Sequence, residues 1–202
     1  MKWIFIFLLS LSVNATAAED IKYFPAGKLE PTSTVKDNYK TKRYAKFLSA
    51  MQEPSLWEMS KTTKNEIYRF LLLRFSDDPV CVRVEISESG DVAVYKKTTS
   101  GRGGAQPGDL KINETKNVSI SDVQALLAQI NNAKFWDLKI EEFSSYKLSV
   151  TDSSKWIFEG VKDGNYQLIE IATPQEGTAD DVILSMGKSF LSTAGMEVEK
   201  LY

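Results

Sequence analysis

The sequence predicts an α+β fold in which helices pack on one face of an antiparallel sheet of about five or six strands. Three runs, EIYRFLLLRF, PVCVRVEI and VAVYKK, follow one another with only short polar turns between them, as in an antiparallel meander. Two later apolar runs flank Asp163 and Gly164, a dipeptide that tolerates the positive φ angles of a two-residue hairpin turn. Helical patterns do not alternate with every strand, so a doubly wound parallel sheet is not expected. The expected order after an N-terminal helix is βββ-α-ββ-α.

The strands differ in the faces that they bury. Residues 66–75 are apolar on both faces apart from Arg69 and Arg74, so we expect a strand that is buried on both sides. Residues 80–86 alternate strictly between apolar and mixed positions. In the later hairpin, a two-residue turn would place four apolar side chains on one core face: Trp156, Phe158, Ile169 and Ile171.

Three helices are expected from apolar stripes at helical spacing. Residues 39–51 form the first, and Ser119 or Ser121 caps the second. The third follows Thr178 as its cap and ends at Gly195. The three stripes are Tyr44, Phe47, Leu48 and Met51; Val123, Leu126, Leu127 and Ile130; and Val182, Met186, Phe190 and Thr193.

Residues 1–18 have the layout of a secretory signal peptide. Lys2 precedes an apolar run of 11 residues, and small residues follow it at positions 15–17. A bilayer-spanning helix needs about 20 apolar residues, so we expect cleavage after Ala17 or Ala18 and no transmembrane segment afterwards. Residues 19–37 mix proline, threonine and charge and are expected to form an extended leader. Residues 38–202 are expected to form a single α+β domain.

Composition indicates a compartment and excludes several partners. Cys81 is the only cysteine, so no intramolecular disulfide can form, and no cysteine follows the signal sequence to carry a lipid. A short signal peptide without cystines favours a bacterial periplasmic or secreted protein that is not lipid-anchored. In that setting the glycosylation sequons at Asn113 and Asn117 are coincidental. The net charge of −2 gives no reason to expect nucleic acid or an anionic membrane as partner.

The chain contains no histidine, which removes Ser-His-Asp and Cys-His arrangements, histidine metal sites and the commonest general base near neutral pH. Cys81 is therefore interpreted as a packed side chain rather than as a nucleophile. Glu159 and Glu170 would share the sheet face opposite Trp156, which is the minimum for a glycosidase-type acid/base pair. The simpler interpretation is a polar pair, and any pairing with Arg69, Arg74 or Arg83 would be a structural ion pair.

The densest glycine run is TSGRGGAQPGDLK, residues 99–111. Gly103 and Gly108 have the spacing of a phosphate loop, but the residues that follow are Asp-Leu where Lys and Ser or Thr are required. Gly101 begins a dinucleotide-binding pattern whose last glycine is replaced by Gln106. We interpret the run as a connection from the third strand toward the next helix, with glycines at positive-φ turn positions. The alternative, binding of an anion or a partner's backbone near Arg102, stays open.

Two further features have a functional and a structural interpretation. The first helix carries the only basic cluster, which would suit an acidic surface or lipid headgroups but is also typical of a solvated helix face; it comprises Lys40, Lys42, Arg43 and Lys46. Three tryptophans of the mature chain suggest an aromatic groove for glycan, although each also has a plausible core position: Trp57, Trp136 and Trp156.

The chain resembles a group of uncharacterised exported bacterial proteins in six segments: EPSLWE, YRFLLLRF, GGAQPGDL, ETK, FWDL and WIFEGVKDGNY. The resemblance covers about residues 53–195. It implies one exported α+β domain and a glycine stretch that is a shared feature of the group. It implies no activity, ligand or functional residue.

We therefore assign no catalytic, cofactor-binding or metal-binding residue and expect no cofactor. The expected function is a non-catalytic binding, accessory or inhibitor module of the cell envelope, with another envelope protein as partner. Open antiparallel strands suit such a role because they can accept a partner by edge pairing. Two alternatives are a carboxylate-dependent hydrolase acting on glycan or peptide, and a structural component of an envelope complex. The sequence assigns no oligomeric state.

Overall fold

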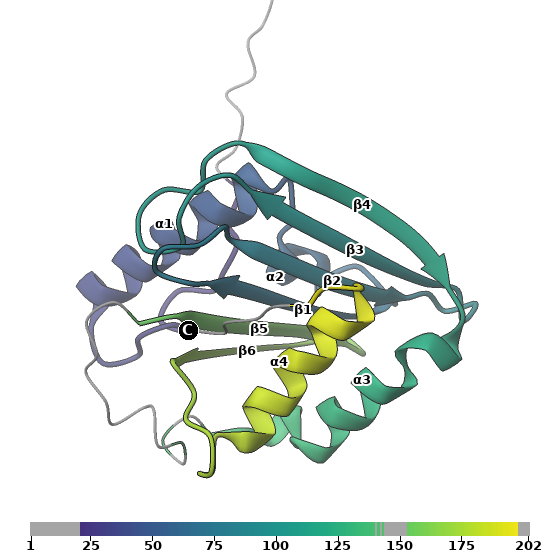
Figure 1. Ribbon diagram of the computed structural model, residues 1–202. Helices are drawn as coiled ribbons and strands as arrows, with labels where there is room; N and C mark the ends of the chain where they lie inside the picture. Colours follow the sequence, from purple (N-terminus) through teal and green to yellow (C-terminus); the bar gives the residue numbers. More distant parts are fainter. Residues whose placement is uncertain (1–20, 140, 142, 144–152, 198–202) are drawn as a thin grey trace, which may run out of the picture.

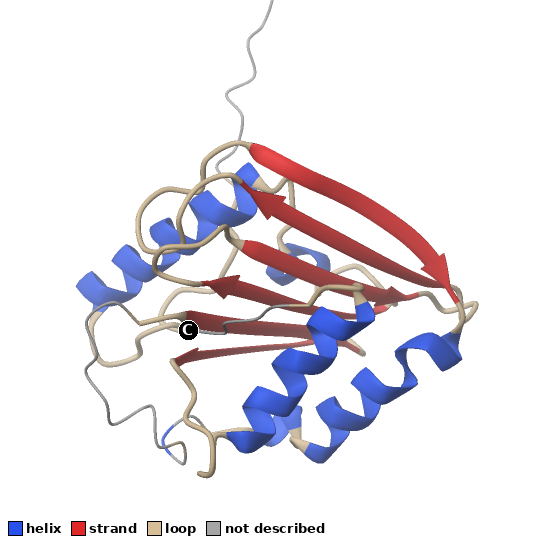
Figure 2. Cartoon of the chain, in the orientation of Figure 1, coloured by secondary structure: helices blue, strands red, loops and turns tan. Residues whose placement is uncertain are grey.

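The computed structural model describes residues 21–139, 141, 143 and 153–197, arranged around one six-stranded antiparallel sheet (Figures 1 and 2). The spatial order of the strands is β4-β3-β2-β1-β5-β6. Their bounds are β1 Glu66–Leu73, β2 Val80–Ile86, β3 Val92–Thr99, β4 Leu110–Val118, β5 Lys155–Lys162 and β6 Asn165–Ala172. The α+β class and the antiparallel sheet predicted from the sequence are thus confirmed.

Helices cover both faces of the sheet, so the prediction that they pack on one face is wrong (Figure 1). Helices α3 (Ile120–Asn132) and α4 (Asp181–Thr193) lie on one face, and α1 (Thr34–Ala50) lies on the other. The short helix α2 (Leu56–Met59) also packs on the α1 face, where Leu56 contacts β1 and β5. A 3-10 turn, η1 (Phe135–Asp137), follows α3.

The pattern of β1 explains why both faces need a cover. Phe70 and Leu72 join the core beneath α3 and α4, whereas Leu71 and Leu73 join the core beneath α1. A central strand that is apolar on both faces gains its hydrophobic stabilisation only if a layer of structure excludes water from each face.

The element order also differs from the expected one, because β4 adds a fourth strand before α3. The expectation treated residues 110–118 as part of a connection. Only β3 pairs with this strand, and most of its side chains are exposed on both faces, so it carries almost no apolar signal. The meander therefore has four strands, and the order after the first helices is ββββ-α-ββ-α.

The hairpin of β5 and β6 follows the prediction. Its two turn residues have positive φ angles, 50° at Asp163 and 75° at Gly164. The resulting register places Trp156 opposite Ile171 and Phe158 opposite Ile169, all buried in the α3/α4 core.

The N-terminal helix starts earlier than expected, at Thr34, and the segment before it packs against the sheet. Tyr23, Phe24 and Leu29 are buried together with the inner side chains of α1. Asp37, in the first turn of α1, accepts hydrogen bonds from the backbone N–H groups of residues 27, 29 and 30. Residues 21–33 thus have no helix or strand but belong to the core, whereas residues 34–37 of the expected leader are helical.

The caps of α3 and α4 explain their ends. Ser119 and Asp122 form the capping box that begins α3, and Gly195 (φ 63°) follows α4. Asp180 precedes α4 as its N-cap, two residues beyond the predicted Thr178.

The predicted stripe of α3 is buried at three positions and partly buried at Leu127. In α4 the predicted Met186 and Phe190 are buried, whereas Val182 and Thr193 are only half-buried.

Candidate functional site

Charged side chains cross the α1 face of the sheet and form the buried ion network, which we define as Glu53, Arg69, Arg83, Lys97 and Glu159. Glu53 follows α1 and pairs with all three cations, at 3.3 Å from Arg69, 2.9 Å from Arg83 and 3.1 Å from Lys97. Arg69 also donates to Glu159 on the neighbouring strand β5. The cations lie on β1, β2 and β3, so one carboxylate joins three adjacent strands.

Further polar groups complete the shell of the buried ion network. The Arg69 guanidinium donates to the Pro54 carbonyl at 2.7 Å, and the Tyr166 hydroxyl donates to Glu159 at 2.7 Å. Lys97 donates to the Gln52 carbonyl at 2.9 Å. Each charge therefore has a partner, which is the condition under which buried ions are tolerated.

The two carboxyl groups of the buried ion network respond oppositely to their surroundings. Burial raises the pKa of Glu53, but the three nearby cations outweigh burial and hold that pKa below its ordinary value. Burial raises the pKa of Glu159 above its ordinary value, although the Arg69 charge and the Tyr166 hydroxyl oppose the shift. Of these two carboxyl groups, only Glu53 has its charged form favoured by its surroundings.

Glu159 and Glu170 share the α1 face, as the register predicted, but they have different partners. Glu159 is buried against Arg69 and Tyr166, whereas Glu170 accepts from Tyr44 at 2.8 Å and pairs with Lys40 at 2.9 Å. Neither lines either of the two hollows described below. The arrangement ties each carboxylate to a structural cation, and Arg69 forms a buried ion pair as the sequence predicted.

Cys81 lies on the same face and is 1% exposed, within the core beneath α1. Burial raises the pKa of its thiol well above the ordinary value, with the Glu53 charge as a further cause. A thiol that is buried and protonated is a poor nucleophile, which agrees with its interpretation as a packed side chain.

The glycine-rich connection folds back onto the turn between β1 and β2. The N–H groups of Gly103 and Gly104 donate to the carbonyls of Asp77 and Phe75. A Cβ on Gly103 would lie 2.3 Å from the Arg74 carbonyl oxygen, so this glycine is needed for close approach. In this stretch only Gly108 has a positive φ, 70°, so the expectation of positive φ at the other glycines is wrong. The run leads to β4 rather than directly to a helix.

The basic cluster of α1 is partly used within the fold. Lys40 pairs with Glu30 and Glu170, and Arg43 donates to the Gly103 carbonyl at 2.6 Å. Lys42 and Lys46 are exposed. Lys46 also donates to the Gln106 side chain at 3.4 Å, so three of the four cations contact neighbouring segments, and the cluster does not form one continuous free basic face.

The three tryptophans do not gather in one groove. Trp156 is fully buried, Trp57 packs edge-on against Tyr166, and Trp136 packs near Tyr68 on the other face. A shallow hollow of about 260 Å³ beside β6 is lined by Trp136, Asn165, Tyr166 and Gln167. Its aromatic lining is Trp136 and Tyr166, and neither Trp57 nor Trp156 contributes to it.

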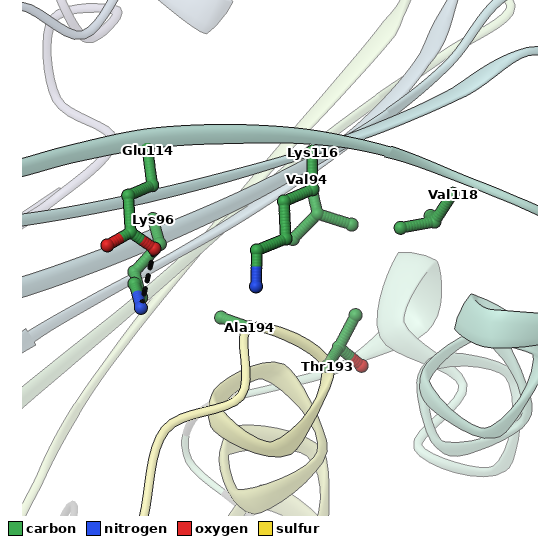
Figure 3. A pocket seen from close by; sticks show the side chains of 7 residues that line it. All are labelled: Val94, Lys96, Glu114, Lys116, Val118, Thr193 and Ala194. Atoms are coloured by element: carbon green, nitrogen blue, oxygen red, sulfur yellow. Dashed lines mark ion pairs between the residues drawn. The ribbon is translucent and has the colours of Figure 1, made fainter.

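A second hollow lies where the end of α4 meets β3 and β4 (Figure 3). Its volume is about 20 Å³, so it holds no more than about one water molecule. Val94, Val118 and Ala194 line it, and the charged side chains of Glu114 and Lys116 on β4 stand beside them (Figure 3). This hollow is too small for an organic ligand, but it shows how β4 presents charges next to apolar atoms.

The two edges of the sheet differ in how they are protected. At the β6 edge, the side chain of Gln167 accepts from the backbone N–H of Leu168 and from Lys28, and it donates to the Trp136 carbonyl. Segments before α1 and after α3 thus fasten onto this edge. At the β4 edge, no hydrogen bond or ion pair within the described ranges reaches Asn113, Thr115 or Asn117 apart from the ladder to β3.

The direction of the β4 backbone groups follows from the neighbouring hydrogen bonds. The Thr99 N–H donates to the Pro79 carbonyl beside β2, so alternate residues of β3, counted from Thr99, face β2. The residues between them face β4, where their partners are Ile112, Glu114, Lys116 and Val118. The intervening residues of β4 direct their N–H and C=O groups away from the sheet; they are Asn113, Thr115 and Asn117.

The sequence analysis predicted neither the strand β4 nor the burial of Glu53. Residues 110–118 are rich in Asn, Glu and Lys, which have low strand propensity, and the only available signal was the alternation of Leu110 and Ile112. Glu53 stands directly before Pro54 in an apparently exposed turn, and nothing in its neighbourhood indicates that it is buried. Both features depend on pairing between residues that are far apart in the chain.

Within residues 21–139, 141, 143 and 153–197, no group of three or more Cys, Asp or Glu side chains could hold a metal ion, and no helix is long and apolar enough to cross a membrane. The predicted signal peptide lies outside the described residues.

Comparison with protein-family models finds no family that matches the chain, and comparison with curated proteins finds no significant match. The resemblance to exported bacterial proteins accordingly stays a prediction.

Proposed function

We propose that the protein is an exported, non-catalytic binding module of the bacterial cell envelope that takes up a partner strand along β4. The observation that carries the proposal is the contrast between its two sheet edges. The Gln167 side chain caps the outward Leu168 N–H and ties two other segments to the β6 edge, whereas no side chain within the described ranges caps the outward backbone groups of Asn113, Thr115 and Asn117 along β4. An unprotected edge of this length is the surface that strand addition uses.

The side chains that the sequence suggested as candidates for catalysis are occupied by structural contacts, and this supports a binding role. Glu159, Glu170 and Cys81 are engaged in or enclosed by the packed layer beneath α1. By contrast, the six side chains 111 and 113–117 of β4 are exposed. An accessory subunit, an inhibitor and a structural component of an envelope complex would all use β4 in the same way, and they differ in the partner that is captured.

Site-specific photo-crosslinking in intact cells tests the proposal. A photoreactive amino acid replaces Thr115 on β4, and a matched control replaces Asn165 at the start of β6, on the opposite edge of the sheet. We expect a discrete crosslinked species at Thr115 that is absent at Asn165 and is lost when Asn113→Pro is added, because proline removes an outward N–H donor. Equal crosslinking at both positions, or none at Thr115, would overturn the proposal.

Export is tested separately by cell fractionation of the full-length chain. We expect the protein in the periplasmic fraction with a mass that corresponds to removal of residues 1–17 or 1–18. Recovery of the uncleaved chain in the cytoplasm would contradict the envelope location.

A further inference from the structure

We propose that the strand that occupies the β4 edge belongs to a second copy of this chain, so that two sheets join into one through antiparallel pairing of β4 with itself. This inference rests on the proposed function, which places a partner strand on β4, and it names that partner. It follows from three properties of β4: the direction of its backbone groups, the order of its charges and its length.

The outward backbone groups restrict the possible registers. Asn113, Thr115 and Asn117 direct their N–H and C=O groups away from β3. In an antiparallel pair, these residues must therefore face one another. A register centred on Thr115 meets this condition, because Thr115 then faces Thr115 of the second copy and Asn113 faces its Asn117.

The side chains are complementary in that same register. Glu114 faces Lys116 of the second copy, and the symmetry of the pair repeats the contact. Ile112 faces Val118, so an apolar contact closes each end. These are non-hydrogen-bonded positions, at which opposite side chains approach most closely and unlike charges stabilise the pairing.

Neighbouring registers lack this complementarity. A register centred on Glu114 would place two glutamates directly opposite each other, and one centred on Lys116 would place two lysines opposite each other. Like charges at directly opposite positions destabilise a strand pair. The alternation of Glu114, Thr115 and Lys116 thus favours one register and disfavours its two nearest alternatives.

The surroundings of β4 leave room for the second copy. Glu114 pairs with Lys96 at 2.7 Å, yet its side chain is still 47% exposed, so its carboxylate can accept a second cation. Lys116 forms no ion pair within the described ranges and stands beside Glu114 on the same face of the strand (Figure 3). The strand has nine residues, which is long for an edge strand that is to stay unpaired.

The first experiment measures mass in solution. Sedimentation equilibrium of the purified mature protein should give twice the mass of one chain. Thr115→Pro should give one chain mass, because Thr115 donates its N–H outward and not to β3. Thr115→Val keeps that N–H and should stay dimeric. A monomer at all accessible concentrations in the unmodified protein would overturn the inference.

Charge reversal tests the complementarity. Glu114→Lys alone and Lys116→Glu alone each place like charges opposite each other, and each should weaken dimerisation about tenfold or more. A mixture of the two variants restores both unlike pairs, and it should form heterodimers with nearly the original affinity. If the mixture dimerises no better than each variant alone, the proposed register is wrong.

Cysteine crosslinking tests the register itself. Thr115→Cys should form a disulfide-linked dimer on mild oxidation, because directly opposite Cα atoms lie about 5.5 Å apart. Asn113→Cys alone should not, since its two copies would lie roughly 14 Å apart. A mixture of Asn113→Cys and Asn117→Cys should crosslink, whereas crosslinking of Asn113→Cys with Thr115→Cys would indicate a different register. The unmodified protein is the background control, because its Cys81 is buried.

The photo-crosslinked species at Thr115 separates this inference from the proposed function. A species of twice the chain mass supports both. A species that contains a different protein, together with a monomer in sedimentation, leaves the proposed function standing and overturns the second copy as partner.

Discussion

Arg69 on β1 donates from its guanidinium to the carboxylate of Glu159 on β5, and both side chains are buried. The two residues face each other in the strand register. The same guanidinium reaches Glu53, so Arg69 is one of three cations that pair with Glu53 and, within the described residues, the only one that pairs with Glu159.

Loss of Arg69 should therefore destabilise the protein strongly. We expect Arg69→Met to lower the free energy of unfolding by about 3–5 kcal/mol, because it leaves buried carboxylates short of a counter-charge. Denaturant unfolding measures the change. The matched control is Lys64→Met, which breaks an ion pair with Glu88 whose side chains are 75% and 63% exposed. The control should cost less than about 1 kcal/mol, and a similarly small cost for Arg69→Met would contradict the structural role of the buried ion network.

The free energy of unfolding should depend on pH through the charge of Glu53. Because the cations around it hold its pKa below the ordinary value, its contribution is fully present above that value and is lost as the pH falls through the lowered pKa. We expect the difference in free energy of unfolding between the unmodified protein and Glu53→Gln to be largest near pH 6 and to shrink toward pH 3. Glu159 has a raised pKa and acts in the opposite sense, but it is present in both proteins and its effect largely cancels. A difference that does not change with pH would show that the Glu53 charge contributes nothing.

Substitution of Gly187 in α4 should lower the free energy of unfolding, although glycine is an unfavourable residue within a helix. An added Cβ would lie 2.2 Å from the ring of Trp156, which is fully buried beneath the helix. We expect Gly187→Ala to lower the free energy of unfolding by at least about 1 kcal/mol, despite the higher helix propensity of alanine. Ser185→Ala, at an exposed position of the same helix, should be neutral or slightly stabilising.

A double-mutant cycle identifies the cause of that loss. In a Trp156→Phe background the smaller ring leaves space for the methyl group, so the cost of Gly187→Ala should fall by about 1 kcal/mol. An unchanged cost would mean that the clash with Trp156 is not the reason.

Cys81 should react only when the protein unfolds. It is the single cysteine, it is buried, and burial raises the pKa of its thiol. We expect labelling by a thiol reagent at pH 8 to be at least about a thousandfold slower in native buffer than in denaturant. Native labelling at the denatured rate would mean that the thiol is accessible and would reopen its interpretation as a nucleophile.

Much of the fold could be predicted because the relevant signals are local. The alternation of residues 80–86 and the Asp163-Gly164 turn define strands and register within a few residues. The capping residue Ser119 and the apolar stripe behind it likewise define α3 from its own sequence. These features depend on backbone preference and side-chain period, which a short stretch of chain carries by itself.

By itself, the sequence determined the antiparallel meander, the hairpin that aligns Trp156 with Ile171, and the exclusion of histidine chemistry. Only the tertiary structure decided that helices cover both faces, that Glu53 lies among three cations, and that Gln167 caps part of one sheet edge while Thr115 lies on the uncapped edge strand β4. The physical reason is that burial and charge pairing depend on neighbours from distant parts of the chain. The cations around Glu53 lie 16 to 44 positions away in the sequence, and Lys28 and Trp136, which contact Gln167 from other segments, lie more than 30 positions from it, so no local pattern encodes these contacts.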